Sequence, residues 1–206
     1  MPVASYVVPP SMGYLMNSPL LFELLQDVQE AGYFQLLDIM PATAGLVEAF
    51  ADQHCKLFLP GCLPALTDLQ NSEELTEQQL RRRLRNAIGL QKGNNARLDV
   101  LLLWDLPNYL NPVLLSGLID TLLSHTQHGT RLHCYIHTRA SMPAESGVYT
   151  FTPGAKIWVE QQTEQSRTSP AYYQEALHKH LAPFVVERSI LLSNGLQEYV
   201  LRRKTE

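Results

Sequence analysis

The sequence has little cysteine, and its arrangement suits neither a disulfide framework nor a metal site. Cys55, Cys62 and Cys134 are odd in number and show no metal-type or redox-type spacing. Small secreted scaffolds depend on densely paired cysteines, so that class of protein is excluded. We expect free thiols, no bound metal and a reducing compartment, which places the protein in the cytoplasm.

Positive charge and long apolar runs are also scarce. Lys and Arg number 16 against 20 Asp and Glu, and the formal net charge of −4 gives no general attraction to nucleic acid or an anionic membrane. No apolar run approaches the roughly 20 residues of a membrane helix. The segment Met1–Tyr14 lacks the basic start and apolar stretch of a signal peptide. We therefore predict a soluble chain without membrane contact.

Apolar periodicity, in contrast, is present along most of the chain. With 206 residues, 45% of them hydrophobic, the sequence can bury one substantial core. We predict a loose lead-in over residues 1–17 and a single domain over residues 18–206. Between residues 62 and 97 one helix is predicted, opened by a capping box of Thr76 and Gln79, and no third strand is visible.

The domain starts as an alternation of helices and short apolar strands, which is typical of a parallel sheet. Leu98–Trp104 is the most strand-like run and is apolar enough to be central in that sheet. Towards the C-terminus hairpins replace the alternation, and Asn194-Gly195 is the strongest hairpin signal. The predicted helices are 18–32, 43–53, 76–88, 113–123 and 170–181. The predicted strands are 34–39, 55–59, 98–104, 131–137, 148–152, 156–160, 185–192 and 197–202.

Two segments resemble motifs of the class I S-adenosylmethionine-dependent methyltransferases. Leu36–Gly45 looks like the family's first motif, a strand that ends in an acid, Asp38, and turns into a helix. Leu98–Leu110 looks like its fourth strand and the following loop, beside which methyl acceptors usually sit. The resemblance covers residues 18–202 in the order of elements. It implies a Rossmann-like, methyltransferase-type three-layer α/β sandwich, with a mostly parallel sheet closed by an antiparallel C-terminal hairpin.

The same resemblance implies S-adenosylmethionine as the cofactor and assigns residues to it. The implied cofactor-binding residues are Asp38, Met40, Ala42, Gly45, Gly61, Trp104 and Leu106. The implied catalytic or acceptor-binding residues are Asp105, Asn108, Tyr109 and His137.

The loop after Asp38 departs from the family's pattern. In the family, glycines at alternating positions let the backbone turn sharply and approach the ligand. Here those positions hold Met40, Ala42 and Ala44, and Gly45 is one step out of phase. A side chain at Met40 would project where the cofactor should lie. The segment therefore keeps the pattern that indicates the fold and loses the pattern that indicates binding.

The second strand lacks the carboxylate that grips the ribose hydroxyls in the family and in dinucleotide folds. The strand ends in Leu57–Gly61, and Asp68 is too far along to substitute. A sugar edge without this partner loses about 1.5–3 kcal/mol, the strength of a hydrogen bond to a charged group. Together the two departures favour a protein that binds the cofactor weakly or not at all over an active enzyme.

The remaining polar candidates each have a simpler interpretation. Asp105–Tyr109 loosely resembles the acid-Pro-Pro-Tyr loop of amino-methylating enzymes, with one residue too many. A turn with a capping aspartate and a packed tyrosine explains it better, although it stays a candidate ligand surface. His137 with Arg139 could serve as a base and an anion clamp. A solvent-facing strand end is the interpretation that we favour there.

A run of arginines lies on the helix face opposite Leu80 and Leu84. Such a run is usually a solvated face; an acidic protein partner is the second interpretation and nucleic acid the third. The run consists of Arg81, Arg82, Arg83 and Arg85.

We therefore predict a methyltransferase-like pseudoenzyme that acts through a protein partner or a homo-oligomer, without membrane or metal and with nucleic acid disfavoured as a partner. Two alternatives stay open. One is an active methyltransferase on a small molecule or a protein. The other is a regulatory module that senses another small ligand in the same cleft.

Overall fold

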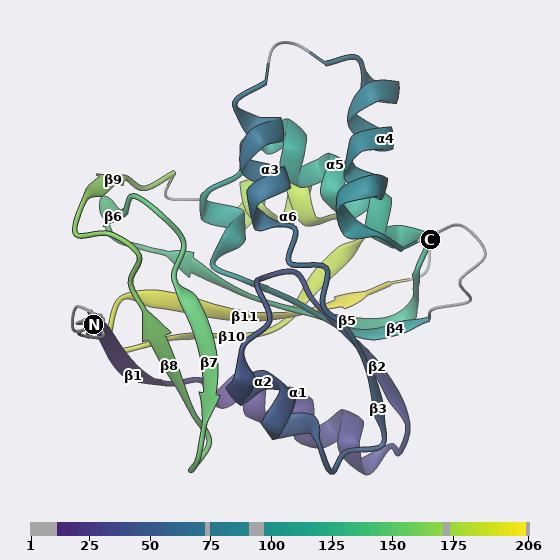
Figure 1. Ribbon diagram of the computed structural model, residues 1–206, viewed down its shortest axis with the longest axis vertical. Coiled ribbons are helices and arrows are strands. Elements are labelled where there is room, and N and C mark those ends of the chain that lie inside the picture. The colour runs from purple at the N-terminus through teal and green to yellow at the C-terminus, as the bar shows by residue number, and fades with distance from the viewer. Residues whose placement is uncertain (1–11, 73–74, 91–96, 171–173, 205–206) are drawn as a thin grey trace, which may run out of the picture.

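A six-stranded mixed sheet forms the centre of the computed structural model, which describes residues 12–72, 75–90, 97–170 and 174–204 (Figure 1). Its strand order is β10-β11-β5-β4-β2-β3, and β3, β2, β4 and β5 run parallel, whereas β11 is antiparallel to β5 and β10. The strands are β2 (Phe34–Asp38), β3 (Cys55–Phe58), β4 (Leu98–Trp104), β5 (Thr126–His137), β10 (Phe184–Leu191) and β11 (Leu196–Arg203). The predicted mostly parallel sheet with an antiparallel C-terminal hairpin is confirmed.

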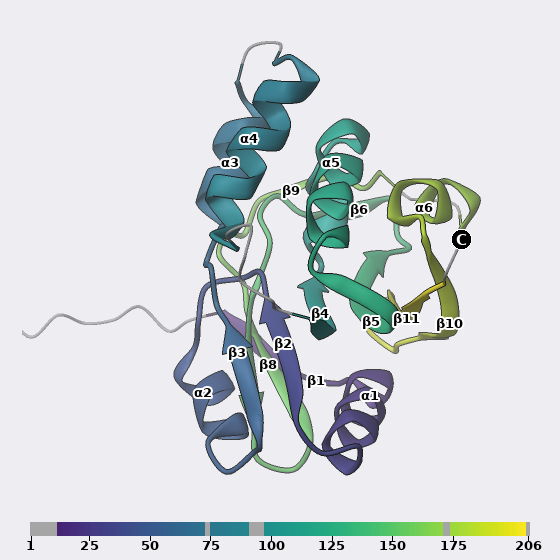
Figure 2. The ribbon, with the colours of Figure 1, turned by 90° about the vertical axis from the view of Figure 1, so that its right-hand side faces the viewer.

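Helices cover both faces of this sheet and complete the predicted three layers (Figures 1 and 2). Two helices lie on one face, α1 (Pro19–Glu30) and α2 (Ala44–Phe50). The other side carries α3 (Leu63–Gln70), α4 (Glu77–Ile88), α5 (Pro112–Leu123) and α6 (Gln174–Leu181). Because both faces are covered, β4 is buried along almost its whole length, which explains its continuous apolar sequence.

The segment between β3 and β4 is helical where it is described. Residues 62–72 and 75–90 contain α3 and α4 and no strand, and α4 begins with the predicted capping box of Thr76 and Gln79. Strand β3 is therefore an edge of the sheet. It is four residues long and carries an exposed Lys56, two features that discourage pairing with another chain.

A second, three-stranded antiparallel sheet packs beside the first, in the order β1-β8-β7. Its strands are β1 (Gly13–Asn17), β7 (Val148–Thr152) and β8 (Lys156–Glu160). The hairpin β7–β8 was predicted, but β1 falls in residues 1–17, where we expected a loose lead-in, and residues 1–11 of that lead-in lie outside the described chain. Two short strands, β6 (Ser141–Pro143) and β9 (Ser166–Thr168), form a further ribbon.

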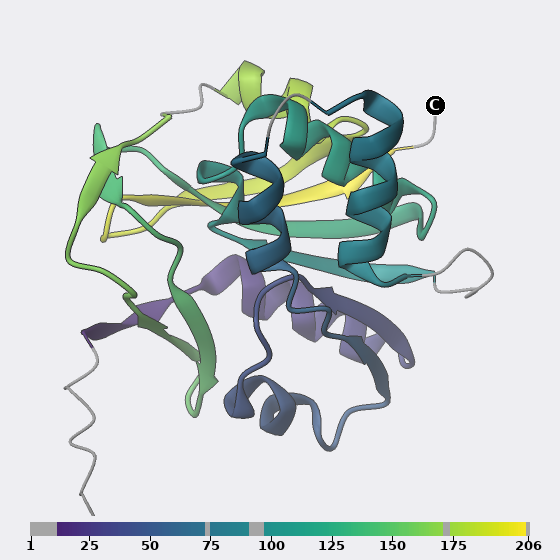
Figure 3. The same ribbon diagram turned by 45° about the horizontal axis from the view of Figure 1, so that its top comes forward.

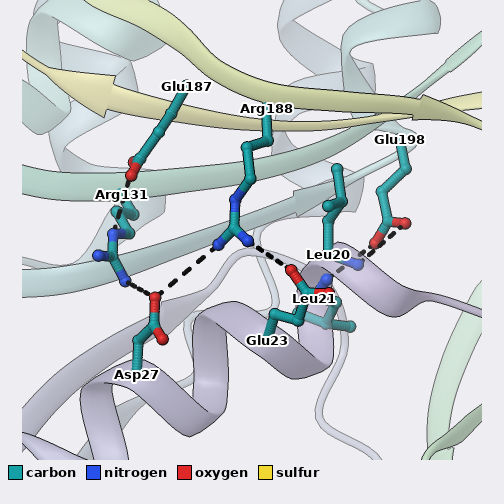
Figure 4. Close-up of polar contacts among 8 residues, drawn as sticks. All are labelled: Leu20, Leu21, Glu23, Asp27, Arg131, Glu187, Arg188 and Glu198. Carbon is teal, nitrogen blue, oxygen red and sulfur yellow. Dashed lines mark hydrogen bonds and ion pairs between the residues drawn. The ribbon is translucent and has the colours of Figure 1, made fainter.

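Helix α1 is attached to the sheet by a carboxylate from the far end of the chain. Its N-cap residue Ser18 makes no cap hydrogen bond of its own. Instead Glu198 on β11 accepts from the backbone N–H of Leu21 (2.9 Å) and of Leu20 (3.3 Å), as Figure 4 shows. A carboxylate at a helix N-terminus satisfies orphan N–H groups and suits the helix dipole.

The same carboxylate gathers further buried partners. It accepts hydrogen bonds from the Ser18 hydroxyl (2.5 Å) and from Nε2 of His133 (3.0 Å), and Ser18 also contacts the Tyr135 hydroxyl. Glu198 and His133 are fully buried. This network joins the start of α1 to β5 and β11.

A surface ion-pair network continues the attachment along α1. Arg131 pairs with Asp27 of α1 and Glu187 of β10, and Arg188 pairs with Glu23 and Asp27 (Figure 4). These five side chains are partly exposed, so each pair contributes little on its own.

Candidate functional site

The switch point of the main sheet lies between β2 and β4. From β2 the chain passes to β3 on one side and then to β4 on the other, and ligands of open α/β sheets bind beyond the carboxyl ends of the strands at such a point. Asp38 ends β2 and Trp104 ends β4. The crevice between these two ends, which we call the switch-point crevice, is where the fold would hold a ligand.

Trp104 fills this crevice from β4. Its indole Nε1 donates a hydrogen bond to Oδ1 of Asp38 (2.8 Å), and its exposure is 0%. Trp104 also has a left-handed φ of 51°, a conformation that is rare for a bulky residue and that points to a local constraint.

Asp38 is buried and accepts hydrogen bonds from the loop that follows it and from the Trp104 indole. Besides the indole it accepts from the backbone N–H of Met40 (3.0 Å). Burial raises the pKa of Asp38 to about 7, against the lowering effect of these two hydrogen bonds.

The hairpin β7–β8 covers the crevice with aromatic side chains. The Tyr149 ring stacks on Trp104 at 4.8 Å between centroids with an interplanar angle of 10°. Phe151 meets the same indole edge to face at 5.9 Å and continues to Phe50 of α2 at 5.6 Å. Both hairpin residues are buried. The alternation of residues along β7 is typical of a strand with one buried face. The sequence does not indicate that this face covers the switch point.

Gly45 lies against this hairpin. A Cβ added to Gly45 would overlap the carbonyl oxygen of Phe151 and lie 2.5 Å from Cγ2 of Thr150. The absence of a side chain therefore lets β7 approach the first turn of α2. The sequence assigned Gly45 to a ligand-binding loop. In the structure the backbone that approaches Gly45 closely belongs to strand β7 and not to a ligand.

The substitution Gly45→Ala is expected to destabilise the fold, although alanine is the better helix former. The added methyl group overlaps backbone atoms of β7, which must shift, so we expect a loss of about 1–3 kcal/mol in the free energy of unfolding. Urea unfolding measures it. Ala49→Gly in the same helix is the control, with a loss of about 1 kcal/mol from helix propensity alone; a stabilised Gly45→Ala variant would contradict the packing described here.

Asp105 binds the start of the β7–β8 hairpin through hydrogen bonds. Its carboxylate accepts hydrogen bonds from the hydroxyls of Ser146 and Tyr149 and from the backbone N–H of Gly147. Burial raises the pKa of Asp105 to about 6, and the hydrogen bonds from Ser146 and Tyr149 oppose that rise. Ser146 and Tyr149 were not among the sequence candidates.

Asn108 and Tyr109 also contact protein groups. The Asn108 amide donates to the carbonyl oxygens of Asp105 (2.7 Å) and Tyr135 (2.9 Å) and accepts from the His137 backbone N–H (2.9 Å). The Tyr109 hydroxyl donates to the carbonyl oxygen of Glu145 (2.9 Å). These side chains hold the loop of the short 3₁₀ helix η1 (Leu106–Asn108) against β5 and the segment before β7.

His137 borders a small hollow together with Tyr14, Asp105 and Tyr149. The hollow has a volume of about 20 Å³, and one water needs about 10–15 Å³. Burial lowers the pKa of His137 to about 4, so its ring is neutral at pH 7. The structure thus brings His137 and Asp105 to one cavity, as the sequence suggested, but the cavity is sized for a single water.

The other implied cofactor residues are spread over the loops around the crevice. Met40 and Leu106 are buried in the core, and Ala42 is exposed. Gly61, three residues after β3, has a left-handed φ of 56°, and a Cβ added to it would lie 4.0 Å from Cα of Pro41. No carboxylate stands on the last residues of β3, as the sequence indicated.

Comparison with known proteins finds similarity at the level of structure. No family model and no curated protein matches the sequence. An S-adenosylmethionine-dependent methyltransferase from Clostridium acetobutylicum is similar with 13% identity and a TM-score of 0.49, over 89% of this chain and 90% of that one. A second from Methanosarcina mazei has 11% identity and a TM-score of 0.49, over 92% and 99%.

A third similar structure is the Burkholderia thailandensis 1,6-didemethyltoxoflavin-N1-methyltransferase, solved with bound S-adenosylhomocysteine. Its identity is 12% and its TM-score 0.47, over 91% of this chain and 77% of that one. The mixed sheet and the antiparallel C-terminal hairpin of the present chain are the arrangement predicted from its sequence. Within the described residues no helix is long and apolar enough to cross a membrane.

Proposed function

We propose that this protein is a non-catalytic member of the methyltransferase-like fold that holds no S-adenosylmethionine and acts through contacts with another protein. The observation that carries the proposal is the filled switch-point crevice. Trp104 occupies it, and Tyr149 and Phe151 close it.

The residues present do not fit the cofactor. A ligand of that size calls for a pocket of about 300–1,000 Å³, whereas Asp38 and Trp104 at the ends of β2 and β4 are only 3% and 0% exposed. Oδ1 of Asp38 accepts hydrogen bonds from both the Trp104 indole and the Met40 N–H of its own loop. The loop glycines and the ribose-binding acid are also missing. The polar groups, the lack of space and the loop sequence therefore all disfavour binding of the cofactor.

The energy of opening the crevice supports the same conclusion. Moving the hairpin aside exposes Tyr149 and Phe151, at about 1.5–3 kcal/mol for each large apolar side chain. It also breaks the hydrogen bonds of Asp105 to the hairpin. An opening cost of about 3–6 kcal/mol weakens the apparent affinity of any ligand by a factor of roughly 10² to 10⁴.

Calorimetric titration tests the cofactor half of the proposal. S-adenosylmethionine and S-adenosylhomocysteine are expected to produce no binding heat up to about 1 mM. The Burkholderia thailandensis enzyme, solved with S-adenosylhomocysteine, is the positive control. A dissociation constant in the low micromolar range would overturn the proposal in favour of an active methyltransferase.

A variant of the loops separates the two obstacles to binding. Met40→Gly with Gly61→Asp restores a loop glycine and a carboxylate at the end of β3 but leaves the three aromatic side chains in place. We expect this variant to stay silent in the same titration, because the filled crevice is the larger obstacle. Binding by it would mean that the loops alone prevent binding in the native chain.

The proposed compartment is the cytoplasm, where unpaired thiols are stable. Cys55, Cys62 and Cys134 are free, and burial raises the pKa of the Cys134 thiol, which makes it unreactive.

A further inference from the structure

Helix α4 concentrates positive charge in an otherwise acidic chain. Arg81, Arg82, Arg83 and Arg85 fall within five consecutive positions, although the whole sequence has only 16 Lys and Arg and a net charge of −4. Together with α3, this helix forms the part of the molecule farthest from the main sheet (Figures 1 and 3). The charge is therefore presented away from the filled crevice.

The way α4 packs fixes the direction of these arginines. Leu84 and Ile88 are buried, and the side chains of Leu80 and Leu84 lie against Gly117 of α5, where a Cβ would be 3.2 Å from Cδ1 of Leu84. Helical spacing then places Arg81 and Arg85 together on one flank. Both line a groove between α4 and α5, which we call the α4–α5 groove.

The α4–α5 groove has the size and chemistry of a binding site for part of a chain. Its volume is about 420 Å³, within the range of about 300–1,000 Å³ for ligand sites. Leu90 and His125, both buried, provide its base, and Asp120 and Ser124 stand on the α5 side. It thus combines an apolar surface with two cations and one carboxylate.

Most of the positive charge on α4 has no anionic partner among the residues that the structure describes. Arg81 pairs with Glu77 of the same helix at 2.5 Å, and both side chains are more than half exposed. Among the described residues Arg82, Arg83 and Arg85 form no ion pair. In contrast, Arg131 and Arg188 each bridge two carboxylates (Figure 4).

We propose that the α4–α5 groove and the adjoining arginines bind an acidic, partly apolar segment of a partner protein. Arg81 and Arg85 would take its carboxylates, Leu90 an apolar side chain, and Asp120 a backbone or side-chain N–H. This assignment names the partner chemistry of the proposed function and rests on it.

Nucleic acid fits this surface less well. The exposed face of α4 is about 18 Å long, and among the described residues that line the groove the only aromatic ring is that of the buried His125, with no Phe, Tyr or Trp for stacking on a base. The net negative charge of the chain opposes a long polyanion more than a short acidic segment.

Fluorescence anisotropy with the full-length chain tests the assignment. The probe is a rhodamine-labelled peptide of about twelve residues made of Glu-Glu-Leu repeats, matching the length of α4. The matched probe has Gln-Gln-Leu repeats, and a single-stranded oligothymidine represents nucleic acid. We expect the acidic peptide to bind in the micromolar range, at least about tenfold tighter than either other probe, and to weaken as salt rises.

A pair of matched variants locates the binding. Arg81→Gln with Arg85→Gln is expected to weaken acidic-peptide binding at least about tenfold, since both charge-assisted hydrogen bonds are lost. Lys156→Gln with Lys179→Gln removes the same charge from exposed positions on β8 and α6 and is expected to change it less than about twofold. Unchanged thermal unfolding of both variants shows that they fold.

Three results would overturn the assignment: no peptide binding up to about 200 µM, equal binding by both variants, or tighter binding of oligothymidine. The cofactor titration separates this proposal from the proposed function. If the protein binds both the acidic peptide and S-adenosylhomocysteine, the proposed peptide site stands and the non-catalytic assignment fails. A chain silent to both keeps the non-catalytic assignment and loses the groove.

Discussion

The substitution Glu198→Ala is expected to lower the free energy of unfolding by about 3–5 kcal/mol, because each buried donor left without an acceptor costs about 1–3 kcal/mol. Glu198 is fully buried and accepts hydrogen bonds from Ser18, His133 and the backbone N–H of Leu21. Without the carboxylate these donors are left unpaired in the core. The first turn of α1 also loses the group that caps it. Urea unfolding at constant m-value measures the loss.

The effect is expected to depend on pH. Burial raises the pKa of Glu198, but the hydrogen bonds from His133, Ser18 and Leu21 outweigh it, so the pKa lies below the ordinary 4.5. A lowered pKa in the folded state means that the carboxylate contributes stability above pH 4.5 and that this contribution is lost as the pH falls through the folded-state pKa. The difference between native chain and Glu198→Ala should therefore be full at pH 7 and shrink in acid.

Two controls define what the loss means. Glu198→Gln keeps an acceptor for Ser18, His133 and Leu21, so we expect a smaller loss than for alanine. Glu187→Ala removes a partly exposed carboxylate that pairs with Arg131 at 3.6 Å, and we expect no more than about 1 kcal/mol. If Glu198→Ala were no worse than Glu187→Ala, the buried network would not anchor α1.

Trp104→Ala is expected to cost about 3–5 kcal/mol, the range for deleting a large buried aromatic side chain. The indole has 0% exposure, stacks on Tyr149 and donates to Asp38. Its removal leaves a cavity between β2, β4 and the hairpin, and leaves Asp38 with the Met40 N–H as its remaining hydrogen bond. Chemical unfolding followed by far-ultraviolet circular dichroism measures the change without relying on tryptophan fluorescence.

Comparison variants separate packing from hydrogen bonding at this position. Trp104→Phe keeps a ring against Tyr149 and loses only the donor to Asp38, so a loss of about 1–2 kcal/mol is expected. Trp158→Ala removes the second tryptophan, which is half-buried on β8, and we expect less than half the effect of Trp104→Ala because less apolar area is exposed. Equal effects at both tryptophans would contradict the view that Trp104 fills the crevice.

Much of the fold could be predicted because its signals are local. The short apolar runs of β2, β3 and β4, the capping box at Thr76 and the Asn194-Gly195 hairpin depend on neighbouring residues only. Their order along the chain was enough to predict a parallel sheet with a C-terminal hairpin. The sequence left open whether residues 62–97 contain a third strand, and of the two helices that the structure places there it predicted only α4.

What could not be predicted depends on contacts between distant residues. Strand β1 pairs with β8, 139 to 147 positions away, and its five residues alone resemble a loose segment. In the sequence Glu198 is an ordinary polar residue of a hairpin. Its role depends on contact with Leu21 of α1, which lies 177 positions earlier in the chain. Propensity and periodicity contain no information about such pairings.

The candidate site shows the same division. The resemblance assigned Asp38 and Trp104 to a cofactor and Asp105 to catalysis or acceptor binding. In the structure Asp38 accepts from the Trp104 indole and from the Met40 N–H, and Asp105 accepts from Ser146 of the segment before the β7–β8 hairpin. The hairpin residues Tyr149 and Phe151 were missed, since an alternating strand does not say which surface it will cover. The position of the crevice could therefore be predicted from the order of the strands. The side chains that fill it could be identified only from the structure.

A crystal structure of the full chain grown with about 5 mM S-adenosylhomocysteine, far above the dissociation constant of a working site, tests the central claim most directly. We predict that Trp104 will be hydrogen-bonded to Asp38 and stacked on Tyr149, with the β7–β8 hairpin in place over the switch point. Density for the nucleoside between the ends of β2 and β4, with Tyr149 and Phe151 displaced, would contradict the account.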